Sequence, residues 1–558
     1  MKAFLLLTVG SVMTTACSDF LDILPMDQVV VENYWQEKAD VTSAVNGCYA
    51  ALADEAVVTR MGVWGELRSE NIVAGSNTSN EINEMLRENL LESNSMCSWA
   101  SFYNVINRCN VVCHYAPQVE KLDPNYTKAE LDATIAEVTT LRSLCYFYLI
   151  RAFRDVPYTK EPSIDDNQNY FLPAMPFNQV LDSLITDLEA VKDNALRRYS
   201  LETVSSSTKR IVVPTENTSR ITQWSIYALL ADLYLWKGDW DNVIRCCDKV
   251  IQNKVDVYKE LLQKDQFNDV ALYDSIPMIL EAVRGSNSVG NAYTEIFGEG
   301  NSFESLFEIF YNGTQENNTW VSNYYGSQNT TIGRLRAADC LADGFTTDNS
   351  PFFISQRDCR YYEGIQSEGT SYSIAKYTRT NASFSLQKLG SVQVAASRRS
   401  NASANWIVYR LSDVLLMKAE ALIERSDSDF AEAFKLINTV YRRANGIAPD
   451  ASDPGLTFEN YNTSKTQMED LLFAERQREF LFEGKRWFDL VRASRREGDT
   501  RRLTSCVIRK YRQDINVIKI KLTDPNYIYF PYTKSELKAN PLLKQNPAFN
   551  KGDEAELK

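Results

Sequence analysis

Residues 221–254, ITQWSIYALLADLYLWKGDWDNVIRCCDKVIQNK, are the stretch that decides how this chain folds. Apolar residues recur in its first half at helical spacing, and Leu230 and Tyr234 fall on one face. Gly238 interrupts the pattern, and a glycine there lets the chain reverse. A second apolar stripe follows and runs to Val250. The stretch therefore predicts two antiparallel helices joined by a tight turn.

The spacing of this unit resembles that of a tetratricopeptide repeat, which is a helix pair of about 34 residues. A weaker copy spans residues 411–445, with its turn near residues 427–429. The periodic stretch 130–153 is the candidate first helix of a third copy, and residues 178–192 are its candidate second helix. Copies spread along the chain predict a mostly α fold built on a tetratricopeptide-like helix-pair scaffold.

Residues 285–405 have a different composition, rich in Gly, Asn, Ser, Thr and Tyr, with few helical stripes. We interpret them as an irregular, loop-rich insertion and as a candidate ligand-binding surface, because idle connectors are rarely so long. A few short strands are expected, including a pair at residues 515–521 and 527–530. The scaffold would cover about 30–280 and 406–500, and residues 501–558 would form an irregular C-terminal segment.

The bulk composition excludes several classes of protein. The formal net charge is −13, which disfavours nucleic acid as a partner, since phosphate contacts need clustered Lys and Arg. His114 is the only histidine, and the cysteines form no CxxC pair. Cys109 and Cys113 lie near it, but packed thiols are favoured over a metal site. We expect no metal and no cofactor.

The N-terminus has the pattern of a secretory signal. Lys2 precedes a short apolar run that is too short to span a bilayer. Thr14-Thr15-Ala16-Cys17 resembles a bacterial lipobox, although Thr14 stands where Leu is usual. We predict a signal peptide at residues 1–16 and lipidation of Cys17, which would begin a single domain over 17–558. The alternative is a plain signal peptide cut nearby.

Glu475 and Glu479 lie four residues apart, and paired carboxylates are what a glycosidase needs. Arginines surround them: Arg476, Arg478 and Arg486. Such neighbours would depress the carboxyl pKa values, which suits an ion-pair network better than a general acid. Gly484 is a candidate C-cap for this helix. No nucleophile elbow, P-loop or zinc-protease motif is present, so we predict that the protein is not an enzyme.

Several blocks in fixed order carry a resemblance to a known family. The most specific is LFAERQREFLFEGKRWFDLVR at 472–492, preceded by YRLSDVLLMKAEAL at 409–422 and followed by YIYFPYTKSELKANPLLKQNPAF at 527–549. CSDFLD at 17–22 and LRSLCYFYLIRAFRDVPY at 141–158 fit as well. Together they resemble the SusD/RagB family over nearly the whole chain, least so within 285–405.

The resemblance implies a cell-surface lipoprotein of the outer membrane, with four tetratricopeptide-like helix pairs supporting an irregular ligand-binding half. Such proteins act as lids on a SusC-like TonB-dependent transporter and capture a nutrient, most often an oligosaccharide, without cleaving it. Asp19 and Asp22 resemble the acidic export signal after the lipidated cysteine. The alternatives are a RagB-like peptide binder, a transporter lid without its own ligand affinity and, less favoured, a glycoside hydrolase.

Sugar binding needs flat aromatic faces beside polar groups. Trp99 and Asn104 resemble a tryptophan and asparagine that contact glycan in the family's starch-binding member, and Arg68 lies near the region of a contributing arginine. The insertion offers further candidates: Tyr293, Trp320, Tyr324 and Tyr325. The competing interpretations are helix packing for Trp99, a surface ion pair for Arg68 and local loop packing for the insertion aromatics.

Overall fold

The computed structural model describes residues 34–164, 170–327, 332–342, 352–387, 389 and 391–550. The predicted signal peptide and Cys17 lie outside these residues.

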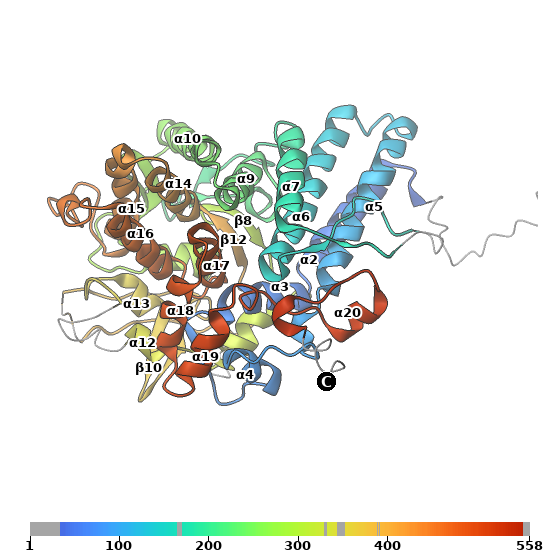
Figure 1. Cartoon of the computed structure of the whole chain (residues 1–558). Helices are drawn as coiled ribbons and strands as arrows, with labels where there is room; N and C mark the ends of the chain where they lie inside the picture. Colours follow the sequence, from blue (N-terminus) through green and yellow to red (C-terminus); the bar gives the residue numbers. More distant parts are fainter. Residues whose placement is uncertain are drawn as a thin grey trace, which may run out of the picture.

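Helix pairs stacked side by side form the scaffold, and Figure 1 shows them in a row, from α2 and α5 through α9 and α10 to α15. Within the described residues there are four pairs, namely α2 (Lys38–Leu52) with α5 (Ala100–Leu122), α6 (Lys128–Phe153) with α7 (Phe177–Val191), α9 (Gln223–Lys237) with α10 (Trp240–Lys264), and α14 (Leu411–Arg425) with α15 (Phe430–Ala444). Each pair also packs on the next. The predicted mostly α, helix-pair fold is confirmed.

The turn between α9 and α10 has the predicted chemistry. Thr222 caps α9 by accepting a hydrogen bond from the backbone N–H of Ser225. Gly238 is the C-cap residue of α9. Its φ is +79°, a backbone conformation that glycine adopts at little steric cost. Asp239 then caps α10 by accepting from the N–H of Asn242. The reversal of the chain is therefore encoded locally.

Further helices surround the scaffold. They are α3 (Glu55–Gly62), α4 (Asn80–Leu86), α8 (Glu216–Ser219), α11 (Asn291–Tyr293), α12 (Asp339–Ala342), α13 (Cys359–Gly364), α16 (Lys465–Glu479), α17 (Arg486–Glu497), α18 (Arg501–Val507), α19 (Ile515–Leu522) and α20 (Lys534–Ala539). Helix α16 packs on α14 and α15, and Arg476 of α16 donates to Asp489 of α17.

The strands are short and mostly antiparallel pairs. One four-stranded sheet has the order β1 (Ile72–Ala74), β9 (Leu335–Ala337), β11 (Ser371–Ile374), β10 (Ile365–Glu368). The two-stranded sheets are β8 (Ser305–Ile309) with β12 (Trp406–Arg410), β2 (Val156–Pro157) with β3 (Ala174–Met175), β4 (Thr203–Val204) with β5 (Ile211–Val212), and β6 (Val270–Tyr273) with β7 (Ile276–Ile279).

The segment 515–522 is a helix, so the predicted strand pair at 515–521 and 527–530 is wrong. Its β-branched residues gave an alternating pattern, but burial follows the helical period. Ile518 and Leu522, four residues apart, are buried, whereas Val517 and Ile520 are exposed. Packing of one helical face has overridden the local strand preference.

The predicted C-cap at Gly484 is also wrong. Helix α16 ends at Glu479 with Phe480 as its C-cap residue. Gly484 instead lies in the connection to α17 with a φ of +71°. Its carbonyl oxygen sits so close to Gly65 that a Cβ on Gly65 would lie 1.7 Å from it. Two backbone segments distant in sequence thus meet at glycine.

Candidate functional site

Arg68 lies inside the molecule, with no exposed surface. Its Nη2 donates to Oε2 of Glu88 at 2.7 Å, and its Nη1 donates to the carbonyl of Ile528 at 2.9 Å. The guanidinium also lies 4.1 Å from the ring centroid of Trp487. These contacts tie the C-terminal segment to the N-terminal half, which is a structural role.

Trp99 and Asn104 do not share a surface. Trp99 is 4% exposed and packs on Phe153 and Tyr532, with ring centroids 5.1 and 4.9 Å away. Asn104 is exposed on α5, where its Oδ1 accepts from Nε of Arg108 at 3.4 Å. The two side chains therefore present no joint platform to a ligand.

The predicted aromatics of the insertion fill the core. Trp320 is 1% exposed, and its ring stacks on Tyr324 at 4.6 Å. Tyr325 donates its hydroxyl to the carbonyl of Phe482 at 2.9 Å, and Tyr293 donates to that of Ala375 at 3.0 Å. Ligand contact by these residues stays a prediction, and their burial favours the packing interpretation.

A groove of about 650 Å³ opens elsewhere in the loop-rich region. It lies between α13, β10 and the segment 392–398. Its walls combine aromatic, amide and guanidinium groups, from Gln356, Tyr361, Tyr362, Gln366, Gln393 and Arg398. This mixture of flat rings and polar side chains is typical of a small-ligand site.

Helix α13 holds the two tyrosines in place. Asp358 caps this helix by accepting from the N–H of Arg360. Nη1 of Arg360 donates to Oε1 of Glu475 at 2.7 Å, which fastens α13 to α16. Tyr361 and Tyr362 follow directly, both partly exposed to the groove. Their rings meet edge to face with centroids 5.3 Å apart.

Tyr362 is backed by Phe384, whose ring centroid lies 5.3 Å away. Its hydroxyl donates to the carbonyl of Gln356 at 3.1 Å. Burial raises the pKa of Tyr362 to about 12, so the phenol stays neutral at physiological pH. A neutral phenol offers both a ring face and an oxygen that accepts hydrogen bonds.

Two arginines converge on one amide at the floor of the groove. An antiparallel bridge brings Arg379 and Arg398 together. Oε1 of Gln366 accepts from Nη2 of Arg379 at 2.9 Å and from Nη2 of Arg398 at 3.1 Å. Burial lowers the pKa of both guanidinium groups. Nη1 of Arg398 is buried and has no hydrogen-bond partner within the described residues.

Glu475 and Glu479 lie in a buried network of charges. Oε1 of Glu479 accepts from Arg410 at 2.6 Å and from Arg443 at 2.5 Å. The arginines Arg443, Arg410 and Arg360 hold the pKa of Glu479 well below its ordinary value, although burial opposes them. A carboxylate in this state does not donate a proton near neutral pH. The contacts agree with the structural interpretation of the pair, but of the three predicted arginines only Arg478 pairs with it, through Glu475. Arg476 pairs with Asp489 and Arg486 pairs with Glu70, so those two partners were predicted wrongly.

Tyr361, Tyr362, Gln366 and Arg398 were not among the residues predicted from sequence. A tyrosine pair in a polar region is the one signal that pointed to them, and the insertion holds two such pairs, at 324–325 and 361–362. Within the parts of the chain that the structure describes, no cluster of three His, Cys, Asp or Glu side chains has a metal-binding arrangement. Across those same residues, no helix has the length and apolarity needed to span a bilayer.

The helical-repeat scaffold thus carries a polar, tyrosine-lined groove of the kind that holds small ligands. Residues 308–549 match the model of the SusD family. SusD-like protein P38 of Formosa agariphila is 24% identical over 86% of this chain and 88% of its own length. The family match covers residues 308–549, and the similarity to SusD-like proteins extends over most of the chain.

Solved structures show the same fold. A SusD homolog from Bacteroides thetaiotaomicron matches with a TM-score of 0.67 at 18% identity, covering 93% of this chain and 99% of its own. A structure described as a putative sugar binding protein from Bacteroides vulgatus matches with a TM-score of 0.62 at 19% identity, covering 92% and 99%.

Proposed function

We propose that this protein captures an oligosaccharide at the cell surface and delivers it to a SusC-like TonB-dependent transporter. The observation that carries the proposal is the groove with Tyr361, Tyr362 and Arg398, found in the loop-rich region of a chain that matches the SusD family model. The similar structure described as a putative sugar binding protein supports the same ligand class. The transporter partner rests on the family resemblance.

In this proposal the exposed part of a tyrosine ring packs against the apolar face of a pyranose. The unpartnered Nη1 of Arg398 and the exposed amide of Gln393 donate to sugar hydroxyls. A volume of about 650 Å³ accommodates a short saccharide rather than a whole polymer. No group in this arrangement needs to react with the ligand, so the function is capture.

The anchor belongs to the same proposal. Cleavage before Cys17 and acylation of its thiol would hold the protein at the outer membrane, with Asp19 and Asp22 directing it to the surface. Several acyl chains bind a membrane firmly, since each buried CH₂ contributes about 0.8 kcal/mol. Residues 17–558 would then act as one domain outside the membrane.

The test is calorimetric titration of the soluble form, beginning after Cys17, with a panel of oligosaccharides and peptides. Tyr361→Ala and Arg398→Gln should each weaken saccharide binding by about 10- to 100-fold, since each removes one well-placed contact. Tyr461→Ala and Arg87→Gln are matched controls outside the groove and should bind as the parent does.

Saturable binding of peptides alone would replace the proposal by a RagB-like peptide-binding function. Absence of binding to either class would favour a lid that works only with its transporter. Saccharide binding that survives both groove variants would contradict this groove as the site.

A further inference from the structure

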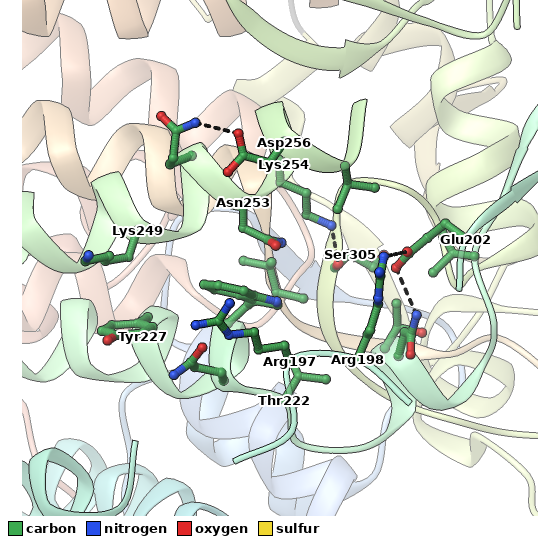
Figure 2. Close-up of a pocket in the computed structure, with 18 of the residues that line it drawn as sticks. Arg197, Arg198, Glu202, Thr222, Tyr227, Lys249, Asn253, Lys254, Asp256 and Ser305 are labelled. Carbon is green, nitrogen blue, oxygen red and sulfur yellow. Dashed lines mark hydrogen bonds and ion pairs between the residues drawn. The ribbon is translucent and has the colours of Figure 1, made fainter. Parts of the chain in front are cut away.

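A second groove, of about 490 Å³, lies on the helical side of the molecule, away from α13 and β10. Its walls come from α9, α10, the loop that follows α7, and β8. Figure 2 shows Arg197 reaching into it from the loop and Lys249 and Asn253 lining it along α10. The capture function proposed above makes no use of it.

The acidic side chains of this groove are already engaged. Glu202 and Glu260 both pair with Nη1 of Arg198, at 3.5 and 3.3 Å. Asp193 accepts from the hydroxyl of Tyr227 at 3.4 Å. Asp256 accepts from the amide of Gln252 at 2.8 Å. Asp193 also pairs with Lys192 at 3.4 Å. Among the described residues, Asp256 has only a neutral donor and keeps its negative charge.

Two cations of the groove are not engaged. Arg197 and Lys249 are exposed side chains, and neither has an ion pair or hydrogen bond to any residue that the structure describes. Lys254, by contrast, donates to the carbonyls of Phe303 and Ser305. The groove lining holds as many acidic as basic side chains, and Arg197 and Lys249 are the cations that remain unpaired among the described residues.

An aromatic platform stands beside these cations. Trp224 and Tyr227 lie three residues apart on α9 and share one face. Their rings are stacked, with centroids 6.3 Å apart and planes inclined by 24°. Trp224 is partly exposed to the groove, unlike the buried Trp320. Asn253, four residues after Lys249 on α10, adds an amide on the same wall.

We infer that this groove binds an anionic saccharide, a short sugar that bears carboxylate or sulfate groups. Trp224 stacks on the apolar face of one ring, and Arg197 and Lys249 neutralise the acid group. A neutral sugar would use the platform but leave both cations unpaired. The site is separate from the tyrosine groove, so this inference does not depend on the proposed function.

The probes are trigalacturonate, its neutral methyl ester and a sulfated chondroitin tetrasaccharide, titrated into the soluble form by calorimetry. The variants are the double substitution Arg197→Gln with Lys249→Gln, and Trp224→Ala. The matched control is Arg87→Gln with Lys435→Gln, since these are also exposed cations without a partner in the described residues. Tyr361→Ala reports on the other groove.

We expect at least one acidic probe to bind. If trigalacturonate binds, its neutral methyl ester should bind at least about tenfold more weakly. The double variant and Trp224→Ala should each weaken acidic binding by about tenfold, whereas the control and Tyr361→Ala should not. Affinity should fall as salt rises, because exposed charges are screened.

Three outcomes would overturn the inference. One is no heat from either acidic probe at concentrations up to about 10 mM, a range in which even weak binding registers. Another is equal loss in the control double variant, which would indicate a general charge effect. The third is acidic binding that depends on Tyr361 alone, which would assign it to the tyrosine groove and leave the capture function standing.

Discussion

At the scale of single residues, burial separates the aromatics that hold the fold from those that can meet a ligand. Trp320 is enclosed by Tyr324, Tyr325 and Trp406, and a Cβ on Gly62 would lie 2.2 Å from its ring. Trp224 and Tyr361 carry similar chemistry but remain partly exposed. A loss of binding on removing Trp320 would therefore report on folding.

Trp320→Ala should reduce the free energy of unfolding by roughly 3–5 kcal/mol, because it leaves a large cavity in the core. Urea unfolding followed by circular dichroism measures this change. Trp224→Ala, which removes a partly exposed ring, is the control and should cost less than about 2 kcal/mol. Equal effects of the two substitutions would contradict the buried position of Trp320.

Gly65→Ala should be among the most damaging single substitutions. Its Cβ would lie 1.7 Å from the carbonyl oxygen of Gly484, and neither partner is a side chain that can rotate away. We expect a loss of more than about 4 kcal/mol or failure to fold, measured by thermal unfolding and soluble yield. At Gly364, a Cβ would meet no atom within 4 Å, so Gly364→Ala should be close to neutral. A well-folded Gly65→Ala protein would show that the two segments can separate.

At the scale of elements, buried ion pairs decide how α13, α14, α15 and α16 meet. Glu479 of α16 accepts from Arg360, Arg410 and Arg443, which come from three other segments. Glu483 extends the network to Lys376, whose Nζ donates to it at 2.6 Å. Such a network stabilises only when complete, since an unpaired buried charge is costly.

Glu479→Gln should therefore lower stability at neutral pH by about 3–5 kcal/mol. The folded protein holds the pKa of Glu479 well below its ordinary value of 4.5. Its contribution is fully present above about pH 4.5 and is lost as pH falls toward the folded pKa. Urea unfolding between about pH 7 and pH 3 should show a smaller acid loss in the variant than in the parent.

Glu432→Gln is the matched control, since it removes an exposed carboxylate paired with Lys418 and should cost less than about 1 kcal/mol. An identical pH dependence for the parent and Glu479→Gln would contradict the assignment of acid sensitivity to this carboxylate.

At the scale of the whole molecule, the scaffold and the loop-rich region present different surfaces. The helix pairs form a continuous row, and α13, β10 and α12 lie beneath it at the opposite edge in Figure 1. The two grooves are built on these separate parts, one on α9 and α10 and one on α13 and β10. A ligand in either groove leaves the other accessible.

The anchor can be separated from binding. Under the proposed function, Cys17→Ser should move the protein from the membrane fraction to the soluble fraction, because it removes the thiol proposed to carry the lipid. Detergent phase partition with immunodetection measures this shift, and saccharide affinity should be unchanged. A variant that still partitions with membranes would contradict lipidation at Cys17. Cys506→Ser is the control, since Cys506 lies inside the folded domain.

Elements formed by interactions between residues close in sequence could be predicted from the sequence, and elements formed by tertiary packing could not. The pairs α6–α7, α9–α10 and α14–α15 were predicted, because periodicity, caps and turn glycines act within a few residues. The helix at 515–522 was not predicted, since the face that it buries is selected by packing on α18 and residues 508–510. The tyrosine groove was not predicted either, because its floor forms only when the folded chain brings Arg379 and Arg398 together in a β-bridge.

The sequence by itself determined the helix-pair scaffold and the family blocks, because both are encoded in the short-range spacing of residue types. It indicated that Glu475 and Glu479 pair with arginines, but the tertiary structure brought the partners of Glu479 to it, namely Arg360, Arg410 and Arg443. Only the tertiary structure decided which aromatics face a groove. Trp320 and Trp224 have the same side chain. Gly62 and Trp406, which come from distant segments, enclose Trp320, whereas Trp224 remains partly exposed to water. Burial is a sum over contacts that lie far apart along the chain, so local spacing does not specify it.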